Sequence, residues 1–198
     1  MVLLDDVKRF DLAKKPERQK LRLLGLLIYL PELLEHGCKI HKHNMEGIKP
    51  PFILFANHNA FLDIKLLAKI PYRKNYIVAI DGFVGREKTL RMVGGICKRK
   101  FTTDIALIRQ LRTVVKNGDV IVIFPEARYS LCGTTATLPE SMGKLAKFLK
   151  VPVVTLLTHG HHINAPFFNT KNHHVKGLYA DLTCIANKEE VETLSIED

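Results

Sequence analysis

The sequence predicts an α/β fold with a largely parallel, mixed β-sheet flanked by helices, preceded by an amphipathic helical segment at the N-terminus. Short apolar runs with the composition of buried strands, such as FILFA (52–56) and DVIVIF (119–124), alternate with stretches of helical periodicity. Strands that alternate with helices at this spacing are typical of a mostly parallel sheet. The composition, 46% apolar and 25% charged, is that of a globular chain.

The first expected element is the leucine-rich stretch that follows AKKPERQK. Apolar residues are almost continuous from Leu21 to Leu34, which predicts one helix, or two helices jointed at Pro31. A basic start followed by a leucine-rich face is typical of a helix at a membrane interface, and equally of a helix packed on the protein's own core. We therefore divide the chain into a membrane-interfacial segment, 1–49, and an α/β domain, 50–198.

The α/β domain contains the remaining expected elements. Gly118 fits the stop of one helix, and Pro139 fits the start of the next. The last residues, NKEEVETLSIED, resemble the beginning of a charged helix, so we expect a shortened C-terminus. Strands are predicted at 52–56, 76–80, 119–124 and 151–157, and helices at 104–118 and 139–150.

Charge and cysteine content narrow the classes of partner. The formal net charge of +10 favours an acidic partner, which includes nucleic acid, an anionic membrane, phosphorylated small molecules and acidic carrier proteins. The four cysteines form no C-x-x-C pair, so we expect reduced thiols of a cytosolic protein. No signal peptide is visible, and the apolar run from Leu23 to Leu30 is shorter than the roughly 20 residues that span a bilayer.

Polar residues that could transfer a proton or bind a phosphate follow two of the predicted strands. In ANHNAFLD (56–63), His58 lies at a strand exit and Asp63 in the first turn of the next helix. The carboxylate can then accept a hydrogen bond from one imidazole nitrogen and leave the other as a base of fixed tautomer. In FPEARYS (124–130), Glu126 and Arg128 directly follow a buried strand, and a guanidinium is a planar fork suited to phosphate.

These motifs resemble those of the glycerolipid acyltransferases, the lysophosphatidic acid acyltransferase family. NHNAFLD (57–63) resembles the family's N-H-x-S-x-x-D, and FPEARYS resembles F-P-E-G-T-R-S, in the same order and at a similar separation. GGICKRK (94–100) and VPVVTLL (151–157) resemble its second and fourth motifs. Departures from the family pattern are Ala60, Cys97, Lys98, Ala127, Arg128, Tyr129 and Thr155, and the arginine of the third motif comes one residue early.

The resemblance implies the glycerolipid acyltransferase fold, with residues 50–198 as the catalytic domain. It implies transfer of a fatty acyl group from acyl-CoA or an acyl carrier protein to the hydroxyl of a lysophospholipid such as 1-acylglycerol-3-phosphate. His58 would be the general base and Asp63 would orient it. Backbone N–H groups after Asn57 are candidates for the oxyanion hole. The residues expected to bind substrate are Asn57, Arg99, Lys100, Glu126 and Arg128, with Arg128 holding the acceptor phosphate.

The same reading implies phospholipid synthesis without a metal or other cofactor, at the inner face of the cell membrane, with the cytoplasmic protein attached peripherally to an anionic surface. No nucleic-acid motif is present. The histidines of THGHHIN could line the cleft or hold the loop, but they lack the spacing of a zinc site. No G-x-S-x-G elbow supports a serine hydrolase. The alternative that stays open is a catalytically silent, basic module that binds membrane or RNA.

Overall fold

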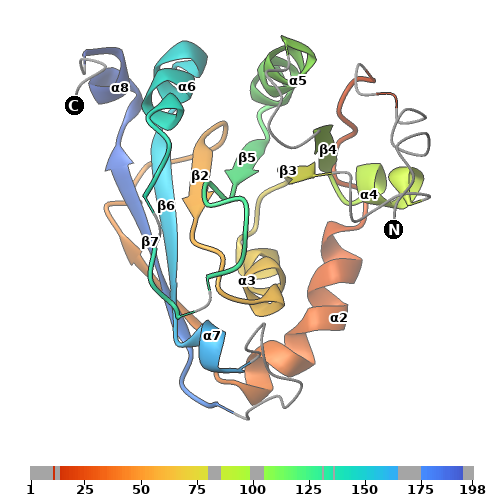
Figure 1. Cartoon of the computed structure of the whole chain (residues 1–198), viewed down its shortest axis with the longest axis vertical. Helices are drawn as coiled ribbons and strands as arrows, with labels where there is room; N and C mark the ends of the chain where they lie inside the picture. Colours follow the sequence, from red (N-terminus) through yellow and green to blue (C-terminus); the bar gives the residue numbers. More distant parts are fainter. Residues whose placement is uncertain are drawn as a thin grey trace.

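A computed structural model of the chain describes residues 11, 14–79, 86–98, 105–130, 132–135, 137–164 and 175–193. In these residues a seven-stranded sheet has the order β1-β7-β6-β2-β5-β3-β4 (Figure 1). All neighbouring strands run parallel except β6 and β7, which are antiparallel. The predicted fold class, a largely parallel but mixed sheet with flanking helices, is therefore confirmed.

The strands expected from the apolar runs correspond to β2, β3, β5 and β6, whereas β1, β4 and β7 were not expected. The strands are β1 (Lys39–His43), β2 (Ile53–Ala56), β3 (Lys74–Ala79), β4 (Gly95–Lys98), β5 (Val120–Ile123), β6 (Val153–His159) and β7 (Tyr179–Ala186). The helices are α2 (Arg22–Glu35), α3 (Phe61–Leu66) with the 3-10 turn η1 (Leu67–Lys69), α4 (Glu87–Met92), α5 (Ile105–Lys116), α6 (Ser141–Leu149), α7 (His161–Asn164) and α8 (Lys188–Thr193).

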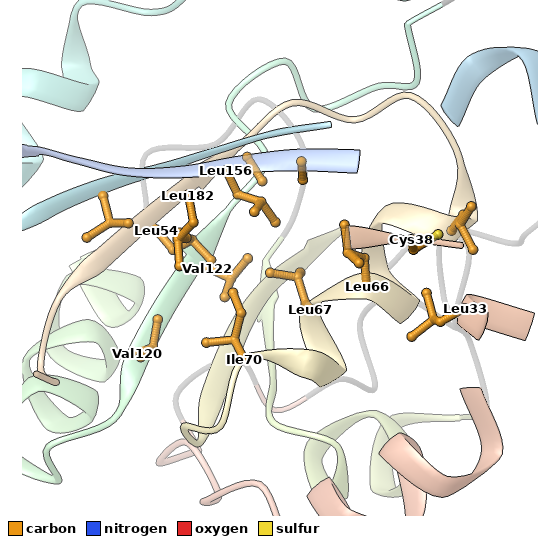
Figure 2. Close-up of a cluster of buried hydrophobic side chains, with 14 of the residues drawn as sticks. Leu33, Cys38, Leu54, Leu66, Leu67, Ile70, Val120, Val122, Leu156 and Leu182 are labelled. Atoms are coloured by element: carbon orange, nitrogen blue, oxygen red, sulfur yellow. The ribbon is translucent and has the colours of Figure 1, made fainter. Parts of the chain in front are cut away.

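Strand β2 shows why the central strands are apolar without interruption. Successive side chains of a strand point to opposite faces, and both faces of this sheet are covered. Leu54 packs in a cluster with side chains of α2 and α3, and Ile53 packs in a second cluster with side chains of α5, α6 and α8. Figure 2 shows the first cluster, in which Leu33, Leu66 and Leu54 come together from α2, α3 and β2. Each such burial contributes about 1.5–3 kcal/mol.

The N-terminal segment is tied to the sheet. Helix α2 is one helix that continues through Pro31, and its Leu33 is fully buried. Before α2, the guanidinium of Arg18 donates to Asp119, with 2.8 Å between Nη2 and Oδ1. Strand β1 pairs with β7, so the boundary that we placed between residues 49 and 50 is not marked by a break in the sheet.

Two further expectations concern the chain ends. The charged helix expected in NKEEVETLSIED begins as α8. Residues 194–198 lie outside the described residues, so the expectation of a shortened C-terminus stays a prediction. In the described part of the chain, no helix has both the length and the apolar character required to cross a bilayer.

The order of the strands locates a natural binding site. From β2 the chain passes through α3 to β3, which lies toward the β4 edge of the sheet. From β5 it passes through α6 to β6, which lies in the opposite direction, toward the β1 edge. At such a switch of direction, the loops at the carboxyl ends of adjacent strands diverge and leave room for a ligand. The loops after β2, β5 and β6 therefore meet at one edge of the sheet.

Candidate active site

His58 and Asp63 form a pair at this edge. His58 follows β2, and Asp63 lies in the first turn of α3. The two side chains approach each other with 3.2 Å between Nδ1 of His58 and Oδ2 of Asp63. The contact therefore uses Nδ1 of the imidazole and leaves Nε2 for other partners, as the spacing in NHNAFLD predicts.

Asp63 is a buried carboxylate that is well supplied with donors. Its side chain is 1% exposed, and Oδ2 also accepts the backbone N–H groups of Asn59 at 2.6 Å and Ala60 at 2.8 Å. Oδ1 lies 2.7 Å from Nδ1 of His161. Burial by itself raises the pKa of Asp63, but the hydrogen bonds from His161 and His58 outweigh it and lower the pKa to about 2. The carboxylate is therefore ionised at neutral pH.

Two of the backbone N–H groups after Asn57, the group from which we expect the oxyanion hole, are already engaged within the site. The backbone N–H groups of Asn59 and Ala60 were candidates to bind the oxyanion, yet both donate to the carboxylate of Asp63. Ala60 replaces the serine of the family motif at the N-cap of α3, where no side chain can accept a hydrogen bond from the first turn. The carboxylate of Asp63 occupies the N–H groups of Asn59 and Ala60, directly before α3, and the oxyanion hole stays a prediction for the other N–H groups of this turn.

Asn57 connects the loops that follow two strands. Its amide nitrogen donates to the carbonyl of Thr158, and its amide oxygen accepts from the backbone N–H of Thr158 at 2.8 Å and from the Thr158 hydroxyl. The side chain of Asn57 is thus engaged in fastening the end of β2 to the end of β6. This places Asn57 as a support of the loop that carries His58, and its expected contact with substrate stays a prediction.

The ring of His58 is held between two aromatic rings of the FPEARYS segment. Phe124 and Tyr129 each have their ring centroid 4.1 Å from that of His58, and the backbone N–H of Ser130 donates to the carbonyl of His58. The His58 side chain is 13% exposed, so most of the ring is shielded from solvent. Burial, together with the negative charge of Asp63, raises the pKa of Tyr129, which therefore stays an uncharged phenol.

Of the remaining residues expected to bind substrate, two lie in the described part of the chain and two do not. Glu126 is half-buried and Arg128 is exposed, both in the turn that follows β5. Between them, Ala127 replaces the family glycine and has a φ of 51°, in the left-handed region that favours glycine. Arg99 and Lys100 lie outside the described residues.

The histidines of THGHHIN have three different environments. Only His161 contacts the pair of His58 and Asp63. His159 bonds to Asp181 on an exposed sheet face, and His162 packs against Gly133. Among the described residues, no group of three His, Cys, Asp or Glu side chains is arranged to hold a metal ion.

Sequence reasoning missed the roles of several neighbours of His58 and Asp63. The contact of His161 with Asp63 joins residues 98 positions apart, and no local spacing announces it. Phe124 and Tyr129 belong to the FPEARYS motif. The expectation that this motif lies beside NHNAFLD was the one signal that could have indicated their contact with His58. A cavity of about 410 Å³ lies elsewhere, against β1 and η1, and is lined by none of the residues of this site.

Comparisons with known proteins bear on the family and the fold of the chain. A family model described as Acyltransferase matches residues 39–159, more than half of the chain. No curated protein matches the sequence. Among solved structures, the chain resembles the 1-acyl-sn-glycerophosphate (LPA) acyltransferase PlsC from Thermotoga maritima, with a TM-score of 0.67 and 17% identity over 85% of this chain and 69% of that one. The chain therefore belongs to the acyltransferase family and has the fold of a glycerolipid acyltransferase.

Proposed function

We propose that the protein transfers a fatty acyl group from a thioester, acyl-CoA or acyl carrier protein, to the free hydroxyl of a lysophospholipid such as 1-acylglycerol-3-phosphate. The observation that carries this proposal is the contact of His58 with Asp63 beside the segment 124–130. Membership of the acyltransferase family supports acyl transfer, and the fold shared with a lysophosphatidate acyltransferase supports the class of acceptor.

The first step is attack of the acceptor hydroxyl on the thioester carbonyl. As the new C–O bond forms, the hydroxyl proton passes to Nε2 of His58, and the carbonyl π electrons move onto oxygen. Since Nδ1 of His58 faces the carboxylate of Asp63, the imidazolium that results is stabilised by a negative charge. Packing between Phe124 and Tyr129 keeps the ring in one orientation during this transfer.

The second step is collapse of the tetrahedral intermediate. The carbonyl re-forms, the C–S bond breaks, and the thiolate takes the proton from Nε2 of His58, which returns the base to its starting state. The step requires no covalent acyl-enzyme and no metal or other cofactor. Cys132, the exposed thiol of the described chain, is not needed as a nucleophile.

The acceptor phosphate is assigned to Arg128. A guanidinium holds a phosphate through two parallel hydrogen bonds, and the exposed position of Arg128 fits a group that meets a headgroup from outside. Glu126, two residues earlier in the same turn, is assigned to orient the arginine or a glycerol hydroxyl. Arg99 and Lys100 are assigned to the same anionic headgroup on the motif resemblance alone, and Asn57 is assigned a supporting position in the acceptor site.

Helix α2 is assigned to the membrane surface. Large apolar side chains stand exposed along one side of the helix, and they lie within about 140° on a helical projection. Since the helix buries its opposite side through Leu33, the exposed side has no partner within the described chain. The proposed acceptor is a lipid, and basic residues precede the helix. We therefore assign the exposed side of α2 to contact with the anionic inner face of the cell membrane. The exposed residues are Leu23, Leu24, Leu27, Ile28 and Leu34.

The first test is thiol release by wild type and His58→Ala. Wild type should release thiol from palmitoyl-CoA or from an acyl carrier protein thioester only when lysophosphatidic acid is present. His58→Ala should lower the rate by about 10²–10⁴-fold, because a general base supplies a factor of this size. His159→Ala is the matched control and should keep wild-type activity. Near-normal turnover by His58→Ala would exclude the mechanism, and no turnover by wild type with either donor would favour a silent module.

The second test addresses the acceptor phosphate. Arg128→Ala should raise the KM for lysophosphatidic acid by roughly tenfold or more and leave the KM for the thioester unchanged, because it removes binding made equally in the ground and transition states. Arg112→Ala removes an arginine that lies over the Phe148 ring on another face, and serves as the control. An unchanged acceptor KM in Arg128→Ala would remove this residue from the phosphate site.

The third test addresses the membrane surface. Deletion of α2 would also expose the core around Leu33, so point substitutions are preferable. The double variant of Leu27→Ser and Ile28→Ser should weaken binding to phosphatidylcholine vesicles that contain phosphatidylglycerol by about tenfold or more, because it removes apolar area from the bilayer contact. Ile185→Ser, on the exposed face of β7, is the control. Equal sedimentation of the three proteins with vesicles would contradict the assignment.

A further inference from the structure

His161 lies beside the pair of His58 and Asp63 but comes from a different part of the chain. It is the first residue of α7, separated from the end of β6 by one residue, and its side chain is completely buried. Its Nδ1 lies 2.7 Å from Oδ1 of Asp63, a shorter contact than the 3.2 Å between His58 and Oδ2. The stronger imidazole contact of Asp63 is therefore made by the histidine that solvent does not reach.

The two carboxylate oxygens of Asp63 face different numbers of hydrogen-bond donors. Oδ2 faces three donors, the backbone N–H groups of Asn59 and Ala60 and Nδ1 of His58, of which His58 is the most distant. Within the described residues, the hydrogen bond with Nδ1 of His161 is the one that Oδ1 makes. A carboxylate oxygen offers about two lone-pair directions. The contact with His58 therefore depends closely on the orientation of the carboxylate, and His161 holds the oxygen that the backbone does not.

Burial determines how His161 can act. Its Nε2 is buried without a hydrogen-bond partner among the described atoms, whereas Nδ1 faces an ionised carboxylate. A ring that carries its proton on Nδ1 leaves only an unused acceptor at Nε2, while a doubly protonated ring would bury a charged, unpaired N–H, which is far more costly. Since no atom of the ring is exposed, His161 is not placed to exchange a proton with substrate.

We propose that His161 is a positioning residue, which donates from Nδ1 to Oδ1 of Asp63 and thereby keeps Oδ2 aligned with Nδ1 of His58. The proposal rests on the proposed function in that His58 is the base whose tautomer matters. Without the donor at Oδ1, the carboxylate has an unsatisfied buried oxygen and gains by turning toward another donor. The His58 ring would then lose the acceptor that keeps its proton on Nδ1 and its lone pair on Nε2.

Two substitutions separate positioning from space filling. His161→Asn places an amide N–H where Nδ1 lies, and His161→Leu fills the site with an apolar side chain and no donor. His161→Leu should lower kcat for acyl transfer by roughly tenfold or more, short of the full 10²–10⁴-fold of general-base catalysis, and leave both KM values near wild type. His161→Asn should restore most of kcat. Equal activity of wild type and His161→Leu, or equal loss in both variants, would overturn the proposal.

The tautomers provide a second readout that needs no activity. Long-range ¹H–¹⁵N correlation spectra of the wild-type imidazoles at neutral pH should show the proton on Nδ1 in both His58 and His161. In His161→Leu, His58 should show a mixture of tautomers. A wild-type His161 with its proton on Nε2 would overturn the proposal even if the leucine variant did not fold. Should wild type transfer no acyl group, the proposed function would fail, while these spectra would still decide the role of His161.

Discussion

The carboxylate of Asp63 is the interaction on which the geometry of the site depends. It is buried, it accepts the backbone N–H groups of Asn59 and Ala60 directly before α3, and it contacts imidazoles that follow two separate strands. Four donors offset the cost of burying the charge and keep the group ionised, with a pKa of about 2. One side chain thereby begins a helix, joins the ends of β2 and β6, and orients the proposed base.

The sheet brings these groups together because β2 lies between β5 and β6. Each neighbour contributes something different at the carboxyl end. From the β6 side, Thr158 fastens Asn57 and His161 contacts Asp63. From the β5 side, Phe124 and Tyr129 pack on the ring of His58. Tyr129 stands where the family motif is expected to have its arginine, so in this chain an aromatic ring takes that place and the arginine moves to the exposed position 128.

Much of the fold could be predicted from local pattern, because β2, β3, β5 and β6 each contain a short apolar run and alternate with helices. Strand β1, at the edge of the sheet, and its neighbour β7 were missed because exposed or partly exposed positions interrupt both strands, as in the polar sequence KIHKH of β1. The contact between His58 and Asp63 was predictable because it is local. The contact of Asp63 with His161 was not, since it depends on which strands become neighbours, and the occupation of the Asn59 and Ala60 amides depends on the exact start of α3.

The most direct measurement is the rate of acyl transfer from palmitoyl-CoA to lysophosphatidic acid by Asp63→Asn, with folding checked by circular dichroism. The amide oxygen of asparagine can still accept the backbone N–H groups of Asn59 and Ala60, so we expect the variant to fold. Without the negative charge the imidazolium of His58 loses its stabilising partner, and we expect kcat to fall by about 10²–10⁴-fold while both KM values stay close to wild type. A folded variant that retains kcat within about threefold of wild type would contradict the role of Asp63 and, with it, the proposed mechanism.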